Sequence, residues 1–311
     1  MLERVTLWFG CVLLCSIPAL PQANPNKVAI LKWYPANTSA EFSVGRAPWG
    51  VVFDGSNIWV TNFVDATVTK LRASDGSRVG TFKTGAGPTA IAFDGANVWV
   101  ANSGSNSTSE IRARDGALVG TFSVGNTPDG IAFDGANVWV ANGFGNTVTK
   151  LRTSDGRLLG TFPTGQEPAC VAFDGANVWV NNYTSGSVTK LRGSDGKNLG
   201  EFSVGAGAEA VAFDGANVWV TNSNSNTVTK LRASDGLTLG TFPVGRTPSG
   251  IVFDGQSMWV TNYGSSTIMK LRISDGKVLG TFPTGSEPLV PAFDGANIWV
   301  PNSEDNSVSK M

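Results

Sequence analysis

Short runs of alternating apolar and polar residues, separated by glycine-containing turns, recur along most of the chain. The stretch from Pro128 to Glu167 is an example, and its pattern predicts four β-strands at 130–133, 138–142, 147–152 and 159–162. An Asp-Gly pair joins the first two strands and another joins the last two, which is a strong hairpin signal because glycine readily adopts a positive φ. Within the second strand, two valines point to one face and a tryptophan to the other. The pattern therefore indicates a sheet that is packed on both faces.

This four-strand unit is present seven times at an interval of 40 residues, with no insertion or deletion between copies. Phe-Asp-Gly opens the first turn of each copy, and a tryptophan follows six residues after the phenylalanine. The phenylalanines are Phe53, Phe93, Phe133, Phe173, Phe213, Phe253 and Phe293, and the tryptophans are Trp59, Trp99, Trp139, Trp179, Trp219, Trp259 and Trp299. Four antiparallel strands in about 40 residues is the pattern of a propeller blade, so the sequence predicts an all-β, seven-bladed β-propeller. A coiled solenoid is the alternative, but 40 residues is long for one coil, and its open ends would need caps.

The two ends of the chain predict how the ring closes. In the 40-residue frame Phe42 matches Phe82, so the segment 28–45 carries a third and a fourth strand without the first two. The last copy, conversely, stops within its third strand. We therefore expect residues 40–44 to form the outer strand of the blade that contains Trp299, which removes the free strand edges.

The N-terminal residues have the features of an export signal. Arg4 precedes an apolar run that is too short to span a bilayer comfortably, and Ala23 is a suitable last residue before cleavage. We expect a signal peptide at 1–23, with an uncleaved membrane anchor as the alternative, and one propeller domain without a membrane span at 24–311. The protein is then expected in the periplasm, at the cell surface or outside the cell, as a monomer. Only Cys170 of the three cysteines lies in that domain, so no intrachain disulfide is expected there.

The composition narrows the chemistry. The chain has 15% charged residues and a formal net charge of −1, so no global field favours nucleic acid or an anionic membrane. It has no histidine, which excludes Ser-His-Asp and Cys-His nucleophile activation and most zinc sites. We expect no cofactor and no metal ion.

The repeat also carries a family resemblance. The pattern VWVANxxxNTVTKL…GTFxVGxxPxGIAFDG resembles the YVTN-repeat, YncE-like propellers, and it is similar to the NHL and streptogramin-lyase-like propellers. The resemblance covers about residues 28–311 and implies the seven-bladed fold, but propellers host unrelated activities. The lyase branch relies on a catalytic histidine, which this chain lacks, so that activity is not carried over. Some YncE-like proteins are associated with DNA binding, which the resemblance permits and the charge does not support.

Several recurrent side chains have both a structural and a functional interpretation. The seven tryptophans could form a stacking array, but their apolar neighbours predict core between the blades. Six arginines precede an aspartate by three residues, as Arg152 precedes Asp155, and most follow a lysine by two residues. We interpret them as an exposed strand whose arginines pair across a turn, rather than as a basic ring for anions. Cys170 occupies a small slot near the axis and is expected to be a buried structural thiol.

The candidate binding site comes from a comparison between the seven copies. The two Asp-Gly turns hardly change from copy to copy, whereas the other two links vary, and alternating strand directions place both variable links on one face. Aromatic and charged residues on loops over a rigid scaffold are typical of recognition sites, although drift in tolerant loops gives the same variation. The candidate ligand-binding residues on this face are Trp49, Phe63, Asp129, Phe144, Tyr183, Glu209, Arg246 and Tyr263.

These observations leave three hypotheses for function. The leading one is an exported, non-catalytic binding or interaction propeller whose partner, an unknown protein, glycan or small molecule, docks on the variable face. The second is a lyase or hydrolase that uses carboxylates on the axis, such as Asp129 and Glu209, as acid and base. The third is single-stranded nucleic-acid binding, which we expect least.

Overall fold

The alternating runs of the third repeat form four antiparallel strands. They are β10 (Pro128–Phe133), β11 (Asn137–Asn142), β12 (Thr147–Arg152) and β13 (Leu158–Pro163), and three of them are one or two residues longer than the pattern predicted. Consecutive strands are hydrogen-bonded neighbours in the order β10-β11-β12-β13. Trp139 lies opposite Ala132 on one side and Lys150 on the other, so the alternation of the sequence is preserved in the register.

The other repeats fold in the same way, and we number the blades 1 to 7 along the chain. Blade 1 comprises β2 (Pro48–Phe53), β3 (Asn57–Asn62), β4 (Thr67–Arg72) and β5 (Arg78–Lys83), and blade 2 comprises β6 (Pro88–Phe93), β7 (Asn97–Asn102), β8 (Ser107–Arg112) and β9 (Leu118–Ser123). Blade 4 comprises β14 (Pro168–Phe173), β15 (Asn177–Asn182), β16 (Ser187–Arg192) and β17 (Asn198–Ser203), and blade 5 comprises β18 (Ala208–Phe213), β19 (Asn217–Asn222), β20 (Thr227–Arg232) and β21 (Thr238–Pro243). Blade 6 comprises β22 (Pro248–Phe253), β23 (Ser257–Asn262), β24 (Thr267–Arg272) and β25 (Val278–Pro283), and short 3-10 turns lie at Ser103–Ser105 and Tyr263–Ser265.

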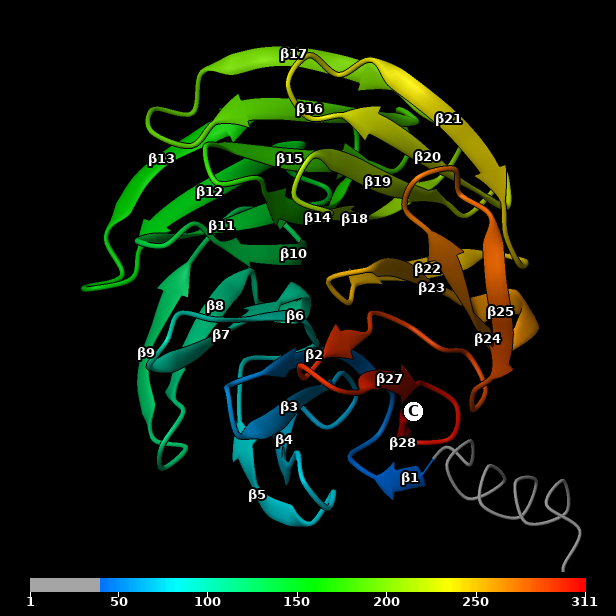
Figure 1. The fold of residues 1–311 in the computed structure, drawn as a ribbon. Helices are drawn as coiled ribbons and strands as arrows, with labels where there is room; N and C mark the ends of the chain where they lie inside the picture. The colour runs from blue at the N-terminus through cyan, green and yellow to red at the C-terminus, as the bar shows by residue number, and fades with distance from the viewer. Residues whose placement is uncertain (1–39) are drawn as a thin grey trace, which may run out of the picture. The chain divides into compact units, whose positions relative to one another are not determined.

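The computed structural model describes residues 40–311, and in them the seven blades are arranged in a ring (Figure 1). The first strand of each blade lies nearest the centre of the ring and the fourth lies on the rim. Within this range no helix is long and apolar enough to cross a bilayer. The expected signal peptide at 1–23, its alternative as an anchor, and the strand expected before residue 40 lie outside the described residues.

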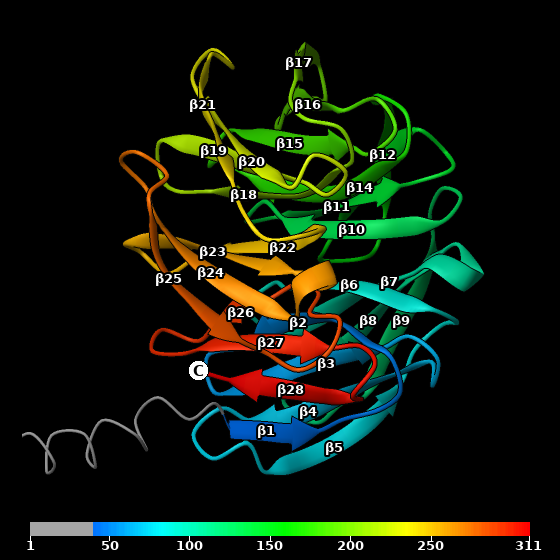
Figure 2. The ribbon, with the colours of Figure 1, turned by 90° about the vertical axis from the view of Figure 1, so that its right-hand side faces the viewer.

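The ring closes by joining the two ends of the described chain. Blade 7 contains β26 (Ala292–Phe293), β27 (Ile298–Asn302), β28 (Ser307–Lys310) and, as its outer strand, β1 (Ala40–Ser43). β1 pairs antiparallel with β28, with Phe42 opposite Val308, and the two strands lie side by side in Figure 2. The predicted closure is thus confirmed, and β1 covers the edge of β28 that would otherwise be free.

The hydrophobic core lies in the seams between blades. Trp139 of blade 3 is fully buried against Val171 and Val178 of blade 4, and the outer-strand Phe162 packs on it at 5.5 Å between ring centroids. Trp299 makes the corresponding contact with blade 1. Six of the seven tryptophans are fully buried, and Trp259 is partly buried against the core of the last seam. A tryptophan packed in a seam is a large apolar contribution, so the interpretation of the tryptophans as core is confirmed.

The turn that follows the first strand holds the tryptophan in place. Asp134 accepts a hydrogen bond from Nε1 of Trp139 at 2.8 Å, and its other oxygen accepts from the backbone amides of Ala136 and Asn137. The same Asp–Trp bond is present in all seven blades at 2.7 or 2.8 Å. The aspartate therefore both closes its turn and anchors the tryptophan of the same blade.

The lysines differ from the sequence interpretation. Lys150 is 6% exposed, and its ammonium lies 4.8 Å from the Trp139 ring centroid and donates to the carbonyl of Gly193 in the next blade at 2.6 Å. The third strand was expected to be exposed, but the neighbouring blade covers it. The lysine hydrogen-bonds across the seam between the two blades, and we call its place in the repeat the clamp position. The arginines, in contrast, do pair with the aspartates across the turn, as Arg152 does with Asp155 at 2.5 Å on the surface.

Candidate ligand-binding pocket on the propeller axis

The two ends of the ring differ in how their links are built. The turn end carries the Asp-Gly turns, 134–136 and 153–157 in blade 3, and the loop end carries the links 124–127 and 143–146. At the loop end the first strand of most blades begins with a β-bulge, located between Pro128 and Gly130 in blade 3. A bulge leaves one residue unpaired and re-aims its side chain, so Asp129 is free of the ladder.

The bulge position is the most variable position of the inner strands. Its occupants are Trp49, Thr89, Asp129, Ala169, Glu209, Ser249 and Leu289. The hydroxyls of Thr89 and Ser249 are buried and bond to the carbonyls of Pro128 and Pro288 in the next blade. The remaining large side chains at this position, those of Trp49, Asp129, Glu209 and Leu289, line the space at the axis.

This space is a pocket of about 440 Å³ to which all seven blades contribute. Its apolar lining includes Val51, Ile91 and Ile131 from the inner strands. Its polar lining is acidic, because three carboxyl side chains line it and no lysine or arginine does. The carboxyls are Asp129, Glu167 and Glu209.

The carboxyls repel one another. Burial, followed by repulsion from Glu167, raises the pKa of Asp129 to about 7. Burial, followed by repulsion from Asp129 and Glu167, raises the pKa of Glu209 to about 7, and a hydrogen bond with Ser223 offsets part of the effect. Partial burial and like-charge repulsion favour the neutral form of both carboxyls, whereas a cation nearby would favour the ionised form.

Aromatic residues complete the wall. Trp49 lines the pocket and packs against Phe63 with 5.5 Å between ring centroids. Tyr183 lines the pocket from blade 4, where its backbone amide donates to the carbonyl of Glu167 at 2.8 Å. The hydroxyl of Thr184 donates to the Glu167 carboxyl, so this loop holds an acidic and an aromatic side chain together.

The eight candidate residues are therefore divided by the structure. Trp49, Asp129, Tyr183 and Glu209 line the pocket, and Phe63 supports it through Trp49. The other three lie away from it. Phe144 is 69% exposed at a loop tip, the Arg246 guanidinium donates to the carbonyl of Gly264 in its own blade, and burial and Glu287 raise the pKa of Tyr263 to about 12.

Two titratable lining residues were not among the candidates. Glu167 immediately precedes the first proline of blade 4 and has a φ of 56°, which places its side chain over the pocket. Cys170 lines the pocket and is half-buried, so it is less enclosed than the sequence interpretation expected, and burial raises the pKa of its thiol. The signal that could have found both is their closeness in sequence to the bulge position of blade 4.

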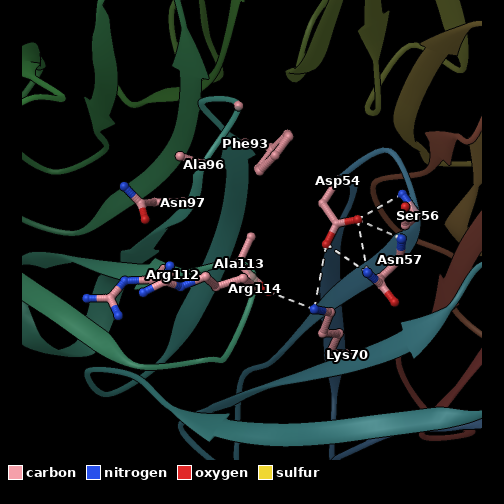
Figure 3. Close-up of a pocket in the computed structure, with 11 residues that line it drawn as sticks. Asp54, Ser56, Asn57, Lys70, Phe93, Ala96, Asn97, Arg112, Ala113 and Arg114 are labelled. Carbon is pink, nitrogen blue, oxygen red and sulfur yellow. Dashed lines mark hydrogen bonds and ion pairs between the residues drawn. The ribbon is translucent and has the colours of Figure 1, made fainter.

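The turn end has wider clefts, which repeat with the blades. Figure 3 shows one of about 640 Å³ between blades 1 and 2, where Lys70 lies beside Asp54 and Arg112 and Arg114 line the other side. A cleft of about 610 Å³ between blades 3 and 4 has a similar lining, with Lys150 and Arg192 at the positions of Lys70 and Arg112 and Ser194 in place of Arg114. Asp54 already accepts from Trp59, and Lys70 donates to Ala113, so these groups hold the seam.

The fold and the pocket define a seven-bladed β-propeller with an acidic, aromatic-walled pocket on its axis. No family model and no curated protein sequence matches the chain. Among solved structures it is similar to the hydrazine synthase of Kuenenia stuttgartiensis, with a TM-score of 0.78 and 19% identity over 85% of this chain and 95% of that chain.

It is also similar to two lyases. A streptogramin B lyase matches with a TM-score of 0.74 and 17% identity, covering 88% of this chain and 96% of that one. The virginiamycin B lyase of Staphylococcus aureus matches with a TM-score of 0.76 and 19% identity, covering 88% of this chain and 98% of that one. At this identity the similarity shows the fold, and it agrees with the propeller resemblance in the repeat pattern.

Proposed function

We propose that the protein is a non-catalytic binding propeller that takes a small molecule in its axial pocket. The observation that carries the proposal is the pocket of about 440 Å³, in which side chains from different blades converge without serving the fold. Trp49, Asp129 and Glu209 occupy one repeat position, yet one is a large aromatic side chain and the other two are carboxyls of different length. A concave, largely apolar pocket with a few convergent polar groups is the usual form of a small-molecule site.

A screen of small molecules against the purified protein tests this proposal. A ligand of the folded state raises the melting temperature by mass action. We expect ligands whose stabilising effect disappears in Trp49→Ala and persists in Phe144→Ala, because only the first side chain lines the pocket. Phe144→Ala is the matched control, since it also removes an aromatic side chain at the loop end. Ligands that bind equally to both variants, or no ligand at all, would argue against the axial pocket.

Acid–base catalysis is a second candidate, favoured by one observation. The pKa values of Asp129 and Glu209 are both raised to about 7, and a carboxyl with such a pKa can donate or accept a proton near neutral pH. Turnover of a pocket ligand that fails in Glu209→Gln, with binding retained, would support a lyase or hydrolase. Without turnover the raised pKa values serve binding alone.

We further propose that the protein acts after export. Support comes from the sequence, where Arg4 and the apolar run after it precede Ala23 as a cleavage site. N-terminal sequencing of protein from its native host should begin near Asn24. Recovery of the full-length chain from the cytoplasm would contradict export and would leave the pocket proposal unchanged.

A further inference from the structure

We infer that the ligand of the axial pocket is a small organic ammonium ion, held by Asp129 and Glu209 and packed against Trp49. The inference rests on the proposed function, because it names the ligand class of the same pocket. Its first support is the sign of the charge. The pocket is lined by three carboxyl groups from blades 3, 4 and 5, and no basic side chain lines it. An anionic ligand would add to this repulsion, whereas an ammonium ion would relieve it.

The second support is the aromatic wall. A cation within about 6 Å of an indole ring is attracted by its quadrupole, and more strongly where water is excluded. The protein uses this combination at its turn end, where six lysine ammonium groups lie 4.8 to 5.2 Å from tryptophan ring centroids. The axial pocket offers the same partners, a tryptophan and carboxyl groups, without a lysine to occupy them.

The third support is that the lining does not suit a metal ion with several protein ligands. Among residues 40–311 no group of three or more acidic, cysteine or histidine side chains is arranged to hold a metal ion. Calcium needs six to eight oxygen ligands at about 2.3–2.6 Å, and the described residues offer no group of three such side chains to begin its coordination. The walls formed by Val51, Ile91 and Leu289 suit a carbon skeleton instead.

Calorimetric titration with matched probes tests the ligand class. Phenethylamine is compared with phenylethanol and phenylacetate, which keep the ring and change the charge, and putrescine is compared with succinate. At about pH 8 we expect each amine to bind at least about tenfold more tightly than its neutral or anionic counterpart. Amines that bind no better than their counterparts overturn the inference.

Variants test whether the preference for amines arises from the carboxyls of the pocket. Glu209→Gln and Asp129→Asn should each weaken amine binding about tenfold, the effect of losing one charge-assisted hydrogen bond. Glu304→Gln makes the same change in net charge at an exposed position and should leave the affinity unchanged. Equal loss in all three variants, or in none, contradicts the inference. Melting temperatures recorded alongside distinguish a lost contact from a lost fold.

The pH dependence of binding provides a second readout. The titratable side chains that line the pocket are Asp129, Glu167, Cys170, Tyr183 and Glu209. Because an ammonium ion requires the ionised carboxyls, its affinity should rise about tenfold between about pH 6 and pH 8, with protons released on binding at the lower pH. Affinity that is flat with pH contradicts the inference. A neutral ligand that binds wild type and fails in Trp49→Ala would keep the proposed function while overturning the ligand class.

Discussion

Two aspartates of blade 3 show how the ends of the propeller differ. At the turn end, burial alone would raise the pKa of Asp134, but hydrogen bonds from Trp139, two backbone amides and Asn137 outweigh it and hold the pKa below its usual value. At the loop end, no described residue donates a hydrogen bond to Asp129, and burial with repulsion from Glu167 raises its pKa to about 7. The Asp134 carboxylate, which supports the fold, is hydrogen-bonded within its own blade. The Asp129 carboxyl has no such bonds among the described residues, which is typical of a group at a functional site.

The seam between blades 2 and 3 is an exception at the turn end, because blade 2 has no lysine at the clamp position. Six blades have a lysine at the clamp position, and blade 2 has Glu110, which is 5% exposed and accepts from Asn97 at 2.7 Å. Burial and the neighbouring Asp94 raise its pKa to about 7. Glu110 therefore resembles the loop-end carboxyls in its raised pKa, but it is buried in a seam and does not line the axial pocket.

The largest effect on stability is expected from removing Asp134, the hydrogen-bonded carboxylate at the turn end. Asp134→Ala removes the acceptor of Trp139 and of two turn amides and leaves the buried Lys150 without its nearest carboxylate. We expect a loss of about 3 kcal/mol in the free energy of unfolding, measured by denaturant titration. Asp155→Ala is the control, because it removes an exposed aspartate that pairs only with its own turn, and it should change stability little. Similar losses in both would mean that the turn aspartates do not support the seams.

The next effect is a gain. Glu110→Lys should introduce the lysine-to-carbonyl bond found in five of the other six seams and remove a buried carboxyl beside Asp94. We expect it to stabilise the protein by about 1–2 kcal/mol near pH 8. Because the folded-state pKa of Glu110 is raised from 4.5 to about 7, its penalty grows as the pH rises from about 4.5 to 7. The gain should therefore shrink below about pH 5. The reverse change, Lys190→Glu, should destabilise a clamped seam, and a neutral result there would undermine the comparison.

Smaller gains are expected at the loop end. The raised folded-state pKa values of Asp129 and Glu209 contribute stability that is present at low pH and lost as the pH rises to about 7. Asp129→Asn and Glu209→Gln should therefore stabilise the free protein by roughly 1 kcal/mol near pH 8 and hardly at all near pH 4, since water at the pocket mouth screens part of the repulsion. Thermal melts across this range measure the difference. A constant difference at all pH values would indicate that repulsion is not its cause.

The smallest effect on stability is expected from replacing Tyr183 in the aromatic wall of the pocket. Tyr183→Ala should weaken binding of a pocket ligand severalfold and lower the melting temperature little, because a side chain at the loop end carries little of the core. Tyr263→Ala lies outside the pocket and should leave binding unchanged. This separation sharpens the sequence hypothesis, which grouped both tyrosines in one site. Loss of binding in Tyr263→Ala alone would place the site over blade 6 instead.

The fold was predictable because the repeat interval is uniform, and one unit therefore predicts all blades. The face of the candidate site was also predictable, since alternating strands place both variable links at one end. The pocket itself was not, because Trp49, Asp129 and Glu209 converge only when bulges turn them towards the axis of a closed ring. The lysines were misinterpreted for a related reason: the pattern of one strand does not reveal that the next blade will cover it.

The most direct test of the account is a carboxyl NMR titration of the wild-type protein with and without phenethylamine. We predict midpoints near 7 for Asp129 and Glu209 in the free protein, and a midpoint below the usual aspartate value for Asp134. The amine should lower the two pocket midpoints and leave Asp134 unchanged, because a bound cation favours the ionised carboxyl. Midpoints near 4 for Asp129 and Glu209 in the free protein, or midpoints that do not change when the amine is added, would contradict the claim that this pocket binds a cation.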